Sequence, residues 1–269
     1  MIVVALSELL LERKKARRRR AFLNYRLSEG GGFRPQVLRL VLQSYNRETM
    51  ASISPQQAIK NALAAARVGT YEAATTSIQA LNGALALYAW NAQVSAALMA
   101  PLHVCEVVVR NAVADALTAV YGPDWPWSPV FATSLPQPTQ GYSARGDLMK
   151  IRAAQPTTGK VIPELKFVFW QTMFTSRFDV RIWHPHLRTV MPHLEAAKTV
   201  PQLRGLIYSE LDQLRKLRNR IAHHEPIFRR NLADDFQKIQ ELIALRCPIT
   251  STWMVNNQQA TALIGAKPP

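Results

Sequence analysis

The residues best suited to do chemistry gather in one short segment, residues 215–226, which reads Arg-Lys-Leu-Arg-Asn-Arg-Ile-Ala-His-His-Glu-Pro. Within these positions stand three arginines, one lysine and two histidines. So many neighbouring cations repel one another unless an anion lies close by. Histidine is the side chain that most readily changes its charge near neutral pH. The segment therefore predicts a site that binds an anionic group and has histidine available to transfer protons.

The expected geometry of this segment follows from its proline. Pro226 disfavours helical conformation at the residue before it, so His223 and His224 are expected in the last turn of a helix, where the helix dipole favours a positive imidazolium. Arg218 and His223 stand five residues apart, about 140° around an ideal helix. They converge only if the helix end distorts or a second subunit completes the site. Arg220 with His223 or His224 would be the easier same-face pair.

The charge of the whole chain favours the same kind of partner. Lys and Arg number 33 against 18 Asp and Glu, which gives a net charge of +15 and a pI near 10.3 in 269 residues. A basic surface concentrates phosphates by long-range attraction, so a polyanion is the expected partner. The apolar content of 48% excludes a chain that is disordered throughout.

Residues 1–49 differ in composition from the rest and carry a surplus of +7, against +8 for residues 50–269. Their run of like charge, Arg13 to Arg20, precedes three glycines and predicts a solvated or disordered extension. A nucleic-acid-binding arm is a second interpretation, and a true start at Met50 is a third. The domain prediction is an extension over 1–49 followed by one helical domain over 50–269.

The remaining chemistry-bearing residues give weaker signals. Cys105 and Cys247 match neither a disulfide framework nor a zinc spacing, so free buried thiols in a reducing, cytoplasmic setting are expected. The histidines of residues 184–193 have no acidic or cysteine residue at a convincing ligand spacing, so neither a metal nor another cofactor is expected. No apolar run approaches the roughly 20 residues that span a bilayer, and no stable membrane insertion is expected. Peripheral membrane association through residues 2–20 is an alternative.

Helical periodicity prevails from Ser54 onward, with no series of strands. Pro101 is expected to separate two helices. The cleanest apolar stripe consists of Leu206, Ile207, Leu211, Leu214, Leu217 and Ile221. Asn231 is the expected N-cap of the last helix, with its buried face formed by Phe236, Ile239, Leu242 and Ile243. The predicted fold class is all-α, a bundle of about five to seven helices.

Seven prolines between Tyr121 and Pro163 predict a long, mostly irregular loop, apart from a short helix near residues 147–153. Trp125 and Trp127 in this loop could anchor it to the bundle or stack on bases. An aromatic segment from Phe167 to Phe174 is expected to form a buried helix.

The motif Arg218-Asn219 with His223 after an interval resembles the signature of the HEPN superfamily, which has Arg, a polar residue and His with four to six residues between Arg and His. The context from Leu217 to Ile227 is similar to the Abi-like (abortive infection) branch. Two upstream segments strengthen the resemblance, which spans roughly Ser54 to the end. They are Tyr88-Ala89-Trp90-Asn91 with Ser95, and Glu106 with Arg110-Asn111.

This resemblance implies an HEPN-like helical bundle that pairs into a homodimer, with the two motifs facing across a shared cleft. It implies metal-independent RNA cleavage as part of phage defence or toxin action, and it leaves room for an antitoxin or another regulatory partner. His223 would be the acid/base group, Arg218 the phosphate clamp and Asn219 an orienting residue. The auxiliary or RNA-binding candidates are Arg220, His224, Arg215, Glu106, Arg110 and Asn111.

Other interpretations of these residues stay open. The motif could be a solvated basic helix end in a noncatalytic HEPN module that binds RNA or a protein. Glu106 and Arg110 have the spacing of a helical salt bridge, which alone could explain them. Asn111 could form a hydrogen bond within the core.

Overall fold

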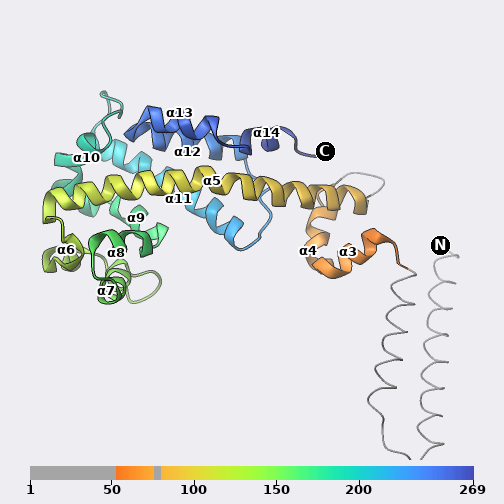
Figure 1. The fold of residues 1–269 in the computed structure, drawn as a ribbon, viewed down its shortest axis with the longest axis horizontal. Coiled ribbons are helices and arrows are strands. Elements are labelled where there is room, and N and C mark those ends of the chain that lie inside the picture. The colour runs from red at the N-terminus through yellow and green to blue at the C-terminus, as the bar shows by residue number, and fades with distance from the viewer. Residues whose placement is uncertain (1–52, 76–79) are drawn as a thin grey trace, which may run out of the picture. The chain divides into compact units, whose positions relative to one another are not determined.

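The computed structural model describes residues 53–75 and 80–269, and every regular element in them is a helix (Figure 1). The prediction of an all-α chain is therefore confirmed. The predicted N-terminal extension, residues 1–49, lies outside the described residues.

The described residues belong to two units, which divide between Ala62 and Leu63. The described end of the first unit contains most of helix α3 (Pro55–Leu63), and the Ser54 hydroxyl at its start accepts a hydrogen bond from Gln57 N–H at 3.2 Å. The domain boundary expected at residue 50 stays a prediction. All candidate site residues belong to the second unit.

The described residues contain twelve α-helices, more than the five to seven expected. They are α3 (Pro55–Leu63), α4 (Ala65–Glu72), α5 (Ala80–Tyr121), α6 (Pro129–Ser134), α7 (Ala144–Ala154), α8 (Thr158–Glu164), α9 (Phe167–Met173), α10 (His184–Val190), α11 (Val200–Ala222), α12 (Leu232–Arg246), α13 (Pro248–Asn256) and α14 (Ala260–Gly265). Two 3₁₀ helices, Trp125–Trp127 and Ser176–Phe178, and a π-helix, Asp179–Trp183, complete the set.

The described residues contain more helices than expected largely because prolines start helices in this chain. Pro126, Pro129, Pro185 and Pro248 each stand in the first positions of an element, where no backbone N–H is needed. The expectation of a mostly irregular segment between residues 121 and 163 is therefore wrong. The expected short helix is present as α7, and Trp125, which is 0% exposed, anchors the segment to the core.

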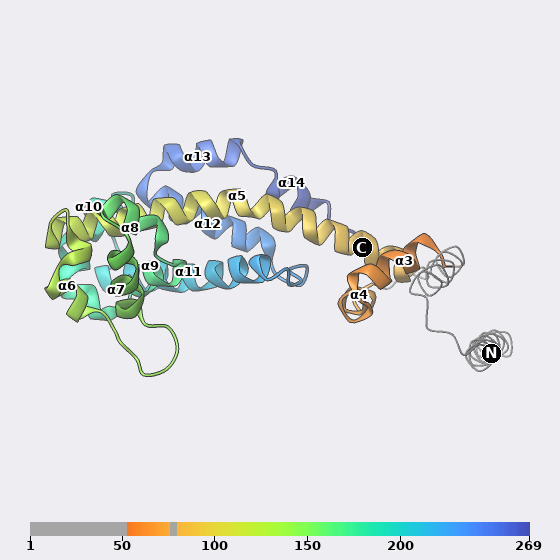
Figure 2. The same cartoon turned by 60° about the horizontal axis from the view of Figure 1, so that its bottom comes forward.

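Helix α5 is continuous over 42 residues, so the predicted break at Pro101 is also wrong. An interior proline removes one backbone hydrogen bond and costs about 3 kcal/mol. Burial offsets this cost, since Pro101 is buried between Leu98 and Leu102. Helices α4, α10, α11, α12 and α14 all pack on α5, which runs through the middle of the bundle in both views (Figures 1 and 2).

The length and composition of α5 would also allow it to cross a membrane. This segment was not recognised from the sequence, because polar residues interrupt its apolar runs while its many alanines raise the mean hydropathy. Of its most apolar window, 33% is buried inside the structure. Core helices of water-soluble proteins can have the same length and composition.

Helices α11 and α12 pack against α5 and against each other. Asn231 is confirmed as the N-cap of α12, since its side chain accepts a hydrogen bond from Asp234 N–H at 3.2 Å. The predicted buried face of α12 is also confirmed. This helix is not the last one, because α13 and α14 follow it. The buried aromatic helix is confirmed as α9, which packs on α11.

Candidate functional site

The cation-rich segment forms the C-terminal half of α11 and the residues that follow it. The helix starts with a capping box, in which the Gln202 side chain accepts a hydrogen bond from Thr199 N–H at 2.9 Å. Its buried apolar residues follow at three- and four-residue steps: Leu203, Ile207, Leu211, Leu214, Leu217 and Ile221. Leu206 was expected in this stripe but is 45% exposed, because it lies one position, about 100°, away from Ile207.

The end of α11 differs from the expectation for the two histidines. His223 is the C-cap residue, and His224 lies past the helix with a φ of 56°. Glu225 N–H donates to the Arg220 carbonyl at 2.8 Å, and His224 N–H donates to the Ile221 carbonyl at 3.0 Å. This is a Schellman ending, whose left-handed position glycine usually occupies. A histidine there costs about 1–2 kcal/mol, and such strain is concentrated at functional sites.

His223 nevertheless continues the helical path. Its N–H donates to the Asn219 carbonyl at 2.9 Å, the bond of a regular helix. The angle of about 140° between Arg218 and His223 around the axis is therefore retained. The helix end does not distort in the way that would bring these two side chains together within one chain. Both histidines are exposed.

Side chains from distant segments hold the loop after α11, residues 223–231, in place. Arg67 on α4 donates to the His224 carbonyl at 2.7 Å. Asn91 on α5, which is 6% exposed, accepts a hydrogen bond from Ile227 N–H at 2.8 Å. Lys267, after α14, donates to the Phe228 carbonyl at 2.8 Å. The loop that follows the histidines is thus fixed from three directions.

The arginines of the motif differ in how far their charge is already paired. Arg215 donates to Gln171 and to Asp212, both at 2.7 Å, so it mainly stabilises the contact between α11 and α9. Arg220 lies 3.5 Å from Glu225, and both are exposed, which makes this ion pair weak. Arg218 is half-buried, and its guanidinium makes no hydrogen bond or ion pair with any described residue.

The neighbouring half-buried residue, Asn219, likewise uses only its backbone within the described residues. Arg218 and Asn219 therefore present unused hydrogen-bond donors at the edge of the buried stripe. A fork of donors with no internal acceptor can bind a phosphate or carboxylate in two-point contact.

The upstream candidates on α5 lie elsewhere. At 1.5 Å per residue, Glu106 is about 22 Å along α5 from Asn91. Glu106 and Arg110 form no ion pair, and the Arg110 Nε is buried without a partner among the described residues, so the alternative of a helical salt bridge does not apply. Asn111 is exposed, so the alternative of a hydrogen bond within the core does not apply to it either. The structure does not bring these three residues to the end of α11.

Glu210 on α11 is a buried carboxyl that the sequence reasoning missed. Glu210 is 9% exposed, and its pKa is raised from 4.5 to about 7. Burial is the main cause, the carboxylates of Glu241 and Asp234 add to it, and the Lys238 ammonium opposes it. The signal was present, because Glu210 follows Ile207 by three residues and therefore falls on the buried stripe.

The thiols and histidines outside the motif form no further site. Cys105 is buried as expected, and burial together with Glu106 and Glu210 raises its pKa far above the ordinary range. Cys247 is only half-buried, so the prediction of a buried thiol is wrong for it. Within residues 53–75 and 80–269, no three His, Cys, Asp or Glu side chains are grouped so that they could hold a metal ion.

The fold and the site define an all-α protein with a cationic, partly unpaired helix end. No protein-family model, curated protein or solved structure matches the chain. Any statement about its function therefore depends on the residues themselves and on their geometry.

Proposed function

We propose that this protein is a metal-independent endoribonuclease of the abortive-infection or toxin type, and an Abi-like member of the HEPN superfamily. The observation that carries the proposal is that Arg218 is half-buried and its guanidinium has no partner among the described residues. Arg218 stands beside Asn219 on the helix that His223 ends. The basic charge of the chain supports RNA as the substrate.

The chemistry needs no group from outside the protein and the RNA. His223 takes the proton from a ribose 2′-hydroxyl, whose oxygen attacks the adjacent phosphorus while the bond to the 5′-oxygen breaks. Arg218 stabilises the charge that builds on the phosphate oxygens, and Asn219 orients the phosphate by a hydrogen bond. The leaving oxygen receives a proton, so the products carry a 2′,3′-cyclic phosphate and a 5′-hydroxyl.

A homodimer is part of the proposal, because Arg218 and His223 point about 140° apart on one helix. If α11 ends from two copies face each other, the arginine of one copy can bind the phosphate while the histidine of the other transfers the proton. The cytoplasm, where RNA is present, is the expected location.

The test is incubation of the purified protein with total cellular RNA in EDTA, followed by chemical mapping of the fragment ends. Cyclic phosphate ends should appear with the wild-type protein and disappear with His223→Ala and with Arg218→Ala. His184→Ala and Arg181→Ala are matched controls, since both residues are exposed and lie in α10 and in the π-helix, away from the end of α11. All four variants should keep the wild-type helical signal and oligomeric state.

Full cleavage by either motif variant would contradict the assigned roles. Intact RNA in every lane would favour the noncatalytic alternative, a module that binds RNA or a protein partner. Salt dependence does not distinguish the two, because it weakens RNA binding in both cases.

A further inference from the structure

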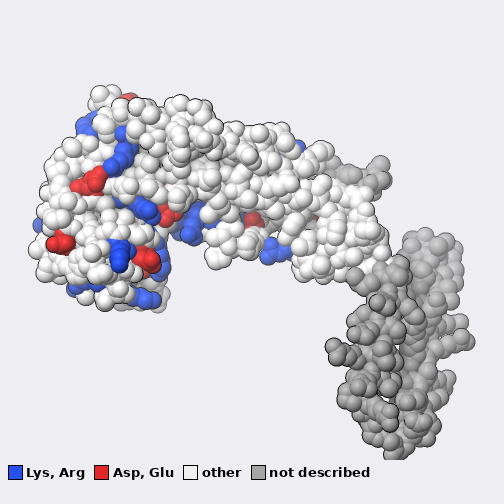
Figure 3. Space-filling model, viewed as in Figure 1, with Lys and Arg blue, Asp and Glu red and all other residues white. Residues whose placement is uncertain are grey.

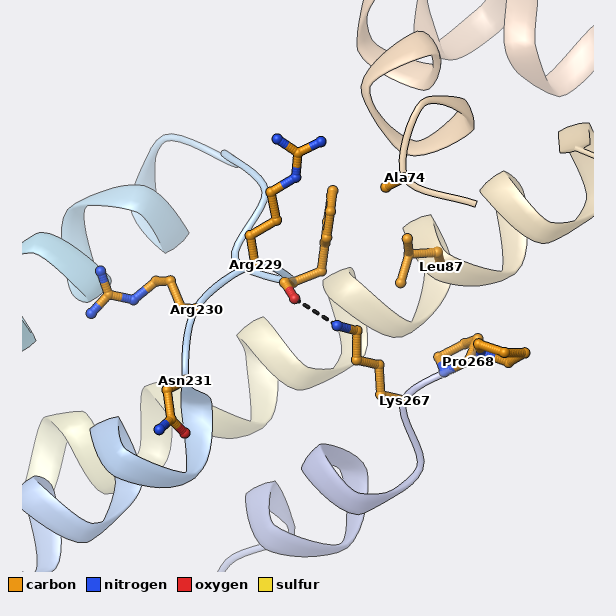
Figure 4. Close-up of a pocket in the computed structure, with 9 residues that line it drawn as sticks. Ala74, Leu87, Arg229, Arg230, Asn231, Lys267 and Pro268 are labelled. Carbon is orange, nitrogen blue, oxygen red and sulfur yellow. Dashed lines mark hydrogen bonds between the residues drawn. The ribbon is translucent and has the colours of Figure 1, made fainter. Parts of the chain in front are cut away.

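A cavity of about 750 Å³ lies beside the loop that follows the motif. It is open to solvent, and three segments far apart in the sequence line it: the end of α4 with the start of α5, the loop before α12, and the residues after α14 (Figure 4). Its lining consists of Ala74, Leu87, Phe228, Arg229, Arg230, Asn231, Lys267, Pro268 and Pro269. Cavities of about 300–1,000 Å³ are typical of small-molecule and cofactor sites.

The three cations around this cavity differ in their availability. Arg230 donates to both carboxylate oxygens of Asp235, at 2.7 and 2.9 Å, so its charge is balanced. Figure 4 shows the Arg230 side chain directed away from Lys267. Arg229 is exposed and makes no hydrogen bond or ion pair within the described residues. Its guanidinium carbon lies over the Phe228 ring, 5.6 Å from the ring centre. Arg229 therefore has its whole donor fork unused.

Lys267 is held in place but not neutralised. Its ammonium donates to the Phe228 carbonyl at 2.8 Å and lies 5.9 Å from the centre of the Trp90 ring. An ammonium has three donors, and no carboxylate pairs with this one among the described residues. Asp234, an acidic residue in the first turn of α12, is bound to Gln213 and Lys238.

The rest of the lining is largely apolar, with Ala74, Leu87 and Pro268 on one side and the Asn231 amide on another. An anionic group that binds Arg229 or Lys267 would thus have an apolar surface next to it. Phosphate beside a planar base is the combination that a nucleotide offers. A bare anion would make no use of the apolar wall, since apolar groups contribute nothing to the binding of an ion.

We propose that this cavity binds one nucleotide of a single-stranded RNA, with its base against Leu87, Ala74 and Pro268 and with its two flanking phosphates on Arg229 and Lys267. The proposal deepens the proposed function and rests on it for the choice of RNA. Arg229 follows His223 by six residues, so their Cα atoms lie within about 21 Å. One short oligonucleotide can therefore reach from the motif into the cavity.

The test uses binding without cleavage, so that it stands apart from the test of catalysis. A fluorescent oligonucleotide of about 12 nucleotides, a length within the usual range of single-strand sites, carries 2′-O-methyl groups throughout and has no nucleophile. The double variant Arg229→Gln/Lys267→Gln should weaken its binding at least tenfold. The slope of log K against log salt should fall by about 1.4, since each lost phosphate contact on a single strand accounts for about 0.7.

The matched control is Lys150→Gln/Lys160→Gln, which removes the same charge from exposed positions on α7 and α8. It should change the dissociation constant less than twofold. Ala74→Trp keeps the charge and fills the cavity, and it should also weaken binding tenfold. A melting temperature close to that of the wild type shows that each variant is folded.

Equal effects of the two double variants would overturn the proposal, because they would indicate attraction by overall charge. Undiminished binding by Ala74→Trp would also overturn it, since the RNA would then not enter the cavity. Cavity-dependent binding of adenosine monophosphate that the oligonucleotide does not displace would assign the cavity to a free nucleotide instead. If the test of catalysis fails and these binding results hold, the cavity remains an RNA-binding site and only the proposal of cleavage is refuted.

Discussion

Replacing Glu210 by glutamine should stabilise the protein above neutral pH and change its stability little in acid. Glu210 is 9% exposed and accepts no hydrogen bond from another described side chain, and its pKa is raised, mainly by burial, from 4.5 to about 7. Glutamine has nearly the same shape and carries no charge. The substitution thus removes the cost of ionising this buried group while keeping the packing between α11 and its neighbours.

The sign and size of the effect follow from the two pKa values. Between pH 4.5 and 7 the folded chain binds the proton more tightly than the unfolded chain does. This carboxyl therefore contributes stability that is present below pH 4.5 and is lost as the pH rises through about 7. At 1.36 kcal/mol per pH unit, the complete loss is about 3 kcal/mol at most.

Urea unfolding at pH 5 and pH 8 measures this difference. The free energy of unfolding of the wild type should fall between these values, and that of Glu210→Gln should fall by about 2 kcal/mol less. Glu164→Gln is a suitable control, because Glu164 is an exposed carboxylate on α8 and should leave the wild-type pH dependence unchanged. The reasoning is refuted if Glu210→Gln keeps the full pH dependence of the wild type.

Three further predictions concern the loop after α11. Asn91→Ala should lower the free energy of unfolding by about 1–3 kcal/mol, because it leaves the buried Ile227 N–H without an acceptor; a loss below 0.5 kcal/mol in urea unfolding would contradict the anchoring role. His224→Gly should raise the melting temperature, since it removes about 1 kcal/mol of left-handed strain, and a lower melting temperature would disprove that strain. Arg67→Met should speed amide hydrogen exchange in residues 223–225 without changing exchange in α12. Exchange in residues 223–225 at the wild-type rate would show that the Arg67 bond does not fix this turn.

Local signals in the sequence predicted the parts of the fold whose cause is local. The cap by Asn231 depends on one side chain and the turn next to it, and the stripe of α11 depends on a three- and four-residue repeat within one helix. Both are confirmed. The same repeat misassigned Leu206, because one position on a helix surface separates a buried side chain from an exposed one.

The errors arose where distant contacts decide the structure. Pro101 would break an isolated helix, but the helices packed around it keep α5 continuous, and nothing near Pro101 in the sequence shows this. The residue types alone were enough to find the motif in the sequence. The side chains that hold the loop after it could not be found in this way, because the bonds from Arg67 and Lys267 to the loop join residues that are 157 and 39 positions apart.

Those long separations impose an order of assembly on the loop. Asn91 leaves the ribosome 136 residues before the Ile227 amide that it binds, and Lys267 follows Phe228 by another 39. At the usual synthesis rate of 5–20 residues per second, roughly 7 to 27 s pass between the synthesis of Asn91 and that of Ile227. During synthesis the loop after the histidines therefore lacks its contact with Lys267 until that residue has been made, whereas Arg67 and Asn91 are already present. A growing chain would thus complete the contacts of this loop only after Lys267 has been synthesised, not alongside the first helices that fold.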